Sequence, residues 1–172
     1  KNLMNTTQEI IKIINRIVLS EDYKVSKKVI SETHSSSLLS IESRAFLYQI
    51  IIQLGFTKVL EIGTYFGGGT KNLANALFKN SGYLITIDPS KDRKDIIEKE
   101  IKSWNEELKE LTYFFPITSS DFFLMKNYAV LQEGIWFDLS IIDGDHSYTG
   151  AFSDLLNCSQ YAGPNGIIIV DD

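Results

Sequence analysis

From Gly55 onward, short runs of apolar residues alternate with longer helical stretches, and this alternation constrains the fold more than any other feature. The runs are almost continuously apolar, which is typical of strands buried on both faces of a parallel sheet. We expect five such strands, at residues 58–62, 83–87, 111–117, 136–142 and 167–170. The sequence therefore predicts an α/β fold, a Rossmann-like doubly wound and mostly parallel sheet with helices on both faces.

The elements around these strands follow from helical periodicity and from turn-forming residues such as glycine and proline. Helices are expected after the first strand up to Asn80, and then at residues 93–109, 120–131 and 149–159, with a turn at 163–166. Residues 1–54 are expected to form an N-terminal helical segment, and residues 55–172 a nucleotide-binding core.

The N-terminal segment shows two helical patterns. Thr6 and Glu9 have the spacing of a capping box, which predicts a helix start. Apolar residues at helical spacing follow it, namely Ile10, Ile13, Ile14 and Ile17. Residues 21–40 are polar and are predicted to be irregular, while residues 41–54 form a second helix that Gly55 ends.

Bulk properties exclude several classes of protein. A length of 172 residues, with 44% hydrophobic and 23% charged residues, suits one globular domain. The net charge of −5 argues against a nucleic-acid-binding surface, and no apolar run is long enough to cross a membrane. The single cysteine, Cys158, allows neither a disulfide nor a cysteine-based metal site, so we expect it to be buried and the protein to be cytoplasmic.

A glycine-rich loop follows the first strand, and its glycines would let the backbone approach a ligand closely. The segment runs Glu61-Ile-Gly63-Thr64-Tyr65-Phe-Gly67-Gly-Gly69-Thr70 and leads into a helix N-terminus, which attracts anionic groups. Its glycine spacing differs from the G-x-G-x-x-G of dinucleotide-binding folds, which opposes a nicotinamide cofactor. A glycine turn without a ligand is the alternative interpretation.

Ligands of such sheets bind outside the carboxyl ends of the strands. Asp88 ends the second strand, where a carboxylate can accept both hydroxyl groups of a ribose, although it could instead cap a helix. Ser119, Ser120 and Asp121 follow the third strand and could meet an adenine edge or cap the next helix.

The fourth and fifth strands both end in acids. Asp143, Asp145 and His146 follow the fourth strand, and Asp171 and Asp172 follow the fifth. If the two strands are neighbours, these carboxylates crowd one edge and would need a cation, and oxygen ligands favour Mg²⁺ or a similar divalent ion. His146 is then a candidate general base, whereas some of the acids, Asp145 above all, could only cap a turn. His34 has no such context and is predicted to be a loop residue.

Over residues 37–172 these segments resemble class I S-adenosylmethionine-dependent methyltransferases. The segment Ile142–Tyr148, together with Gly163–Asp172, resembles the metal-dependent small-molecule O-methyltransferases, especially the branch similar to macrocin O-methyltransferase. Members of that branch continue beyond the fifth strand, so we expect the C-terminal strands of the family to be missing from this sequence.

The resemblance implies roles for the motif residues. The segment from Glu61 to Gly67 would hold the methionine part of S-adenosylmethionine, and Asp88 the ribose. Asp143, Asp171 and Asp172 would hold Mg²⁺ or a similar divalent cation, and His146 would be the base. Counting the adenine candidates, the predicted cofactor-binding residues are Glu61, Gly63, Thr64, Tyr65, Gly67, Gly69, Thr70, Asp88, Ser120, Asp121 and Asp143.

The predicted reaction is methyl transfer to a hydroxyl group of a small molecule, such as a sugar or a catechol-like natural product. Asp143 and His146 are the predicted catalytic residues. The N-terminal helices could also join copies of the chain into a homo-oligomer. A nicotinamide-dependent enzyme and a non-catalytic cofactor-binding module are the alternatives.

Overall fold

We describe the chain from a computed structural model, which covers residues 3–33, 37–125 and 136–171, with the backbone alone at residues 3–6. The predicted His34, and the end of the helix predicted at 120–131, lie outside these residues, as does Asp172.

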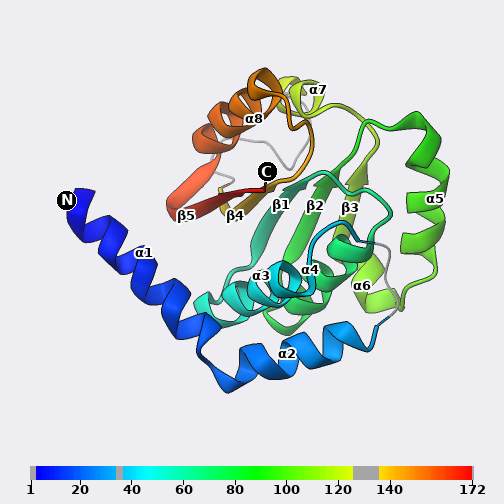
Figure 1. Ribbon diagram of the computed structural model, residues 1–172. Helices are drawn as coiled ribbons and strands as arrows, with labels where there is room; N and C mark the ends of the chain where they lie inside the picture. Colours follow the sequence, from blue (N-terminus) through cyan, green and yellow to red (C-terminus); the bar gives the residue numbers. More distant parts are fainter. Residues whose placement is uncertain (1–2, 34–36, 126–135, 172) are drawn as a thin grey trace.

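The sheet has five parallel strands in the order β3-β2-β1-β4-β5 (Figure 1). Their bounds are β1 (Lys58–Ile62), β2 (Tyr83–Ile87), β3 (Thr112–Phe115), β4 (Phe137–Ile142) and β5 (Ala162–Val170). The Rossmann-like doubly wound fold is therefore confirmed. Because β4 pairs with β5, the two acid-ended strands are neighbours, as the predicted cation site requires.

Helices cover both faces of this sheet. They are α1 (Leu3–Val18), α2 (Glu21–Ser31), α3 (Ile41–Leu54), α4 (Gly68–Lys79), α5 (Lys91–Lys102), α6 (Glu106–Glu110), α7 (Ser119–Leu124) and α8 (Tyr148–Gln160). Figure 1 shows α3 and α4 on one face and α7 and α8 on the other, with α2 outside α3 and α4. Alternate residues of the strands pack into two hydrophobic cores, one on each face of the sheet. Val59 belongs to the core on the first face and Leu60 to the core on the second.

The N-terminal segment differs from prediction in two ways. Helix α1 begins at Leu3, so Thr6 lies within the helix and the predicted capping box is wrong. Residues 21–31 form helix α2 rather than an irregular segment, because Ser20 caps its first turn and Tyr23, Ser26 and Ile30 are buried beside α3. Helix α3 and its left-handed C-cap at Gly55 (φ +66°) are confirmed.

The face predicted for α1 is only partly buried. Ile17 is fully buried, whereas Ile10 and Ile14 are 47% and 40% exposed. The helix projects away from the sheet, as Figure 1 shows. Contact between copies of the chain through these helices remains a prediction.

Two further boundaries are corrected in the core. The helix expected at 93–109 is two helices, because Asn105 accepts a hydrogen bond from the backbone N–H of Leu108 and so begins α6. Residues 163–166 lie within β5 rather than before it. They bulge opposite Asp138, since Ala162 pairs with Phe137 and Ile167 pairs with Leu139.

Two expectations from composition can be compared with the structure. Cys158 is fully buried, as predicted. In the part of the chain that the structure describes, none of the helices has both the length and the hydropathy for a membrane span.

Candidate functional site

The residue that follows each of four strands lies on one edge of the sheet, because its backbone N–H continues the ladder onto the neighbouring strand. Gly63 donates to the carbonyl of Ile87 and Asp88 to that of Phe115, at 2.8 and 3.2 Å. Asp143 and Asp171 donate in the same way to Ile62 and Ile142, at 2.8 and 2.9 Å. The carboxyl edge predicted to carry the site therefore brings these loops together.

A cavity of about 560 Å³ opens at this edge, within the usual size range of small-molecule sites. Of the residues predicted from sequence, its lining contains Gly63, Tyr65, Asp88, Ser120, Asp143 and His146. A larger cavity of about 710 Å³ lies between α2, α3 and α4, but none of the predicted residues lines it. The convergence of polar groups, not the volume, makes the first cavity the candidate site.

The glycine-rich loop needs glycine for two different reasons. Gly63 has φ +106°, and a Cβ there would overlap the backbone carbonyl of Asp143. Gly67 has φ +85°, and a Cβ there would meet the Glu100 side chain at 3.3 Å. Neither Gly67 nor Gly69 lines the cavity; Gly67 is the N-cap residue of α4, and Gly69 lies in its first turn.

Glu61 lies beneath the cavity rather than in its lining, and only 3% of it is exposed. Its Oε2 accepts hydrogen bonds from the hydroxyls of Thr70 and Thr86, at 2.7 and 2.6 Å. Thr64 extends this network through a 2.6 Å hydrogen bond with Thr86. Burial raises the pKa of Glu61 from 4.5 to about 7, although the two hydroxyl bonds oppose the shift.

This pKa predicts a dependence of stability on pH. The folded protein binds the Glu61 proton more tightly than the unfolded chain does. Protonation of Glu61 therefore stabilises the folded state fully below about pH 4.5, and this contribution is lost as the pH rises to about 7. We expect Glu61→Gln, which keeps the acceptor but cannot ionise, to gain about 3 kcal/mol in unfolding free energy relative to wild type between pH 4.5 and 8.

Urea unfolding at pH 4.5 and pH 8 measures this difference. Glu42→Gln is the control, because Glu42 is fully exposed and its pKa is lowered by the hydrogen bond from Lys27, so its difference should be small and of opposite sign. An unfolding free-energy difference for Glu61→Gln that does not change with pH would contradict the prediction.

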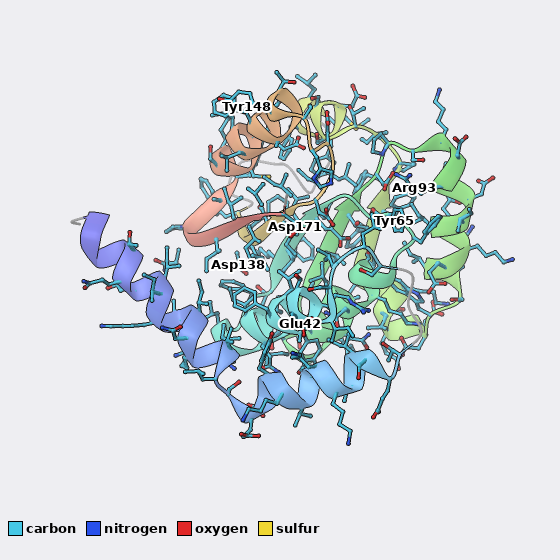
Figure 2. All side chains as sticks on the ribbon, in the orientation of Figure 1. Glu42, Tyr65, Arg93, Asp138, Tyr148 and Asp171 are labelled. Carbon is cyan, nitrogen blue, oxygen red and sulfur yellow. The ribbon has the colours of Figure 1, made fainter. Side chains whose placement is uncertain are left out.

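Asp88 is 2% exposed and is already surrounded by donors. Its Oδ2 accepts from the backbone N–H of Tyr65 and its Oδ1 from that of Ser90, both at 2.9 Å. The guanidinium of Arg93 approaches both oxygens at 3.3 and 3.4 Å. Figure 2 shows Arg93 beside Tyr65, whose ring centre lies 5.5 Å from the guanidinium carbon.

The three residues after β3 have different positions. Asp121 is exposed and accepts a hydrogen bond from the hydroxyl of Thr118, the residue that caps α7, so its contacts belong to the helix cap. Ser120 is exposed at the cavity, and Ser119 lines the cavity as well. The hydroxyl of Ser119 donates to Asp154 of α8 at 2.5 Å.

The acids beyond β4 and β5 lie near one another. Nε2 of His146 is 3.8 Å from Oδ1 of Asp143. Burial, and then the negative charge of Asp171, raises the pKa of Asp143, while His146 opposes the shift. Asp145 accepts from the backbone N–H of Ser147 and is exposed, which fits the predicted turn cap.

Metal ligation at this edge depends partly on a residue outside the described part of the chain. Within residues 3–33, 37–125 and 136–171, no group of three metal-ligating side chains converges. Asp171 is close enough for its negative charge to act on Asp143, and Asp172 is not described. Two oxygen donors from adjacent strands fit the chemistry of a hard cation.

Sequence reasoning missed two charged residues of the lining, Arg93 and Asp154. Arg93 follows Asp88 by five residues, but nothing in its spacing distinguishes it from the other charges of α5. Asp154 and Cys158 are the two buried residues of α8. The sequence places Asp154 four residues before Cys158, on the same helix face as a residue predicted to be buried, and this spacing could have indicated a buried acid.

Comparisons with known proteins identify the family to which the chain belongs. A family model described as a methyltransferase domain matches residues 60–172, which is well over half of the chain. No curated protein sequence matches the chain.

Several solved structures share the fold at low identity. An O-methyltransferase from Bacillus cereus, in complex with S-adenosylhomocysteine (SAH), is 20% identical with a TM-score of 0.67, and the match covers 95% of this chain and 72% of that one. The O-methyltransferase TomG from Streptomyces achromogenes, in complex with S-adenosylmethionine and involved in tomaymycin synthesis, is 18% identical with a TM-score of 0.65, covering 89% and 66%. An SAH-bound methyltransferase from Podospora anserina is 15% identical with a TM-score of 0.61, covering 97% and 69%.

The family match covers the strand ends that line the cavity, from Gly63 through Asp88 to Asp143. The solved structures share the fold over 89–97% of this chain. The chain therefore belongs to the methyltransferase-domain family of S-adenosylmethionine-dependent enzymes.

Proposed function

We propose that this protein transfers a methyl group from S-adenosylmethionine to a hydroxyl group of a small molecule, with a divalent cation at the acceptor. The observation that carries the proposal is the single cavity shared by Asp88, Asp143 and His146, at the carboxyl edge of the sheet, where α/β folds of this kind bind their ligands. The similar B. cereus and S. achromogenes proteins are both O-methyltransferases, which favours oxygen as the acceptor atom.

The cofactor would extend along the edge from β1 toward β3. Its methionine part would lie by the loop that begins at Gly63. Because Gly63 has no side chain, the backbone of this loop can pass close to that of Asp143. Its ribose would bind Asp88, where the two hydroxyls would compete with the guanidinium of Arg93 for the carboxylate. The contact with Arg93 is long and partly exposed, so exchanging it for ribose hydroxyls costs little.

Asp143 and Asp171, with Asp172 beyond the described residues, would hold the cation. When bound, a divalent cation lowers the pKa of an acceptor hydroxyl and orients it. His146 lies at the same cavity with 52% of its side chain exposed, so it can reach a bound acceptor and take its proton. The acceptor itself, a sugar or a catechol-like natural product, and the macrocin-like branch remain predictions.

Calorimetric titration with SAH tests the cofactor assignment. We expect wild type to bind SAH and Asp88→Asn to bind it about 10- to 100-fold more weakly, because hydrogen bonds to a charged group contribute about 1.5–3 kcal/mol. Asp92→Asn, an exposed acid in the first turn of α5, should bind like wild type. Binding of NADH without any response to SAH would instead favour the nicotinamide alternative.

Titration with Mn²⁺ tests the cation. We expect Asp143→Asn to lower Mn²⁺ affinity about tenfold or more, because removing a carboxylate removes a charged oxygen ligand. Asp145→Asn is the matched control, since this acid lies two residues away at the same cavity but is exposed and accepts the backbone N–H of Ser147. Equal Mn²⁺ affinity of wild type and Asp143→Asn would remove Asp143 from the proposed site.

A further inference from the structure

Asp154 is a buried carboxylate that the proposed reaction does not use. It lies on α8 with 4% of its surface exposed, and it lines the cofactor cavity. Its Oδ1 accepts a hydrogen bond from the hydroxyl of Ser119. Burial, with a contribution from the charge of Asp145, raises its pKa, while the Ser119 hydrogen bond acts in the opposite direction.

The other carboxylate oxygen has unused capacity. Among the described residues, Oδ2 of Asp154 accepts no hydrogen bond, and the carboxylate has no basic side chain within salt-bridge distance. Nor is this oxygen sealed in the core, since it is not among the inaccessible polar atoms without a partner. A buried carboxylate is costly unless donors satisfy it, so a donor from a bound ligand fits this position.

The position along the edge indicates which part of the ligand this is. Asp88 ends β2, and Ser119 follows β3, the strand beside it. With the methionine part by the β1 loop and the ribose at Asp88, the base would extend toward Ser119 and Asp154. Asp121, the acid that sequence alone suggested for this role, is exposed and bonded to Thr118.

The chemistry of the base then follows from the carboxylate. An ionised carboxylate only accepts hydrogen bonds, and the 6-amino group of adenine only donates them. A 6-oxopurine presents an acceptor at the same place, which the carboxylate repels.

We propose that Asp154, held in place by Ser119, accepts a hydrogen bond from the 6-amino group of the cofactor's adenine and so selects adenine over 6-oxopurines. The inference rests on the proposed function, because it requires the adenosine part of S-adenosylmethionine to occupy this cavity. Asp154 is thus a specificity-determining residue, supplied by the helix after β4 rather than by the loop after β3.

Paired titrations with SAH and S-inosylhomocysteine, which carries oxygen in place of the 6-amino group, test this role. We expect wild type to favour SAH by about tenfold or more. Asp154→Asn should bind the two within about threefold of each other, because an amide can donate as well as accept. Asp92→Asn, an exposed acid outside the cavity lining, is the control and should keep the wild-type preference.

A role in folding alone would change the affinity for both ligands equally and leave their ratio unchanged, so the ratio is the deciding measurement. Should Asp154→Asn fail to fold, Ser119→Ala replaces it and should reduce the preference by about threefold or more, since the carboxylate loses its orienting donor. A full preference for SAH in the folded variant would overturn the role of Asp154 while leaving the proposed function intact. Wild type that binds neither compound would overturn both.

Discussion

Replacing His146 with alanine should lower kcat by about 10²- to 10⁴-fold and leave the affinity for SAH nearly unchanged. The imidazole lies at the cavity and 3.8 Å from Asp143, but it makes no hydrogen bond with the described residues. A general base acts in the transition state, so its loss appears in turnover rather than in binding. The folded state should not suffer, because the side chain is half exposed.

Steady-state turnover with a sugar or catechol acceptor that wild type methylates, together with SAH calorimetry, measures this split. Thr149→Ala is the control, since Thr149 is an exposed neighbour in the same segment but does not line the cavity. Full turnover by His146→Ala would return His146 to the role of an exposed turn residue.

Gly63→Ala should destabilise the protein by about 3 kcal/mol or more and abolish SAH binding. The added Cβ would overlap the backbone carbonyl oxygen of Asp143 and lie 2.6 Å from its carbonyl carbon, at a φ of +106°. Both atoms belong to backbone at the junction of β1 and β4, so they cannot move aside without breaking the hydrogen bond from Asp143 to Ile62. The clash therefore displaces a predicted site residue as well as a strand end.

Thermal unfolding should show this as a drop in Tm of about 10 °C for a domain of this size. Gly55→Ala separates the two causes, because Gly55 also has a positive φ (+66°) but nothing lies within 4 Å of its Cβ position. We expect that control to cost only about 1–2 kcal/mol from backbone strain. Equal losses in the two variants would show that the contact with Asp143 does not matter.

The sequence predictions that the structure confirms are those in which one physical effect determines the local conformation. Strands β1 and β2 have the predicted bounds, because a run of apolar residues that both faces of a sheet bury leaves little choice of register. Helix α3 ends where Gly55 takes up a left-handed conformation that other residues avoid. Asp88, Asp143 and Asp171 lie on one edge because each follows a strand, and the strands are parallel.

Where local signals were weak, packing decided the structure. Helix α2 has a polar sequence, and only the burial of Tyr23, Ser26 and Ile30 beside α3 reveals its inward face. In the opposite case, Thr6 and Glu9 matched a helix start, yet the helix continues one turn further back. A local motif competes with every neighbouring residue that can also form the helix, so it does not set the boundary by itself.

The sequence by itself determined the sheet, the edge that carries the site and the acids placed there, because strand direction sends every residue after a strand to the same side. Only the tertiary structure decided which of these residues share a cavity. It buried Glu61 beneath the cavity, which raises its pKa, and it joined Asp121 by a hydrogen bond to Thr118, the N-cap of α7. It also brought Asp154 to Ser119 across 35 residues of chain. Such contacts depend on how α7 and α8 pack on the sheet, and no spacing within one segment encodes that packing.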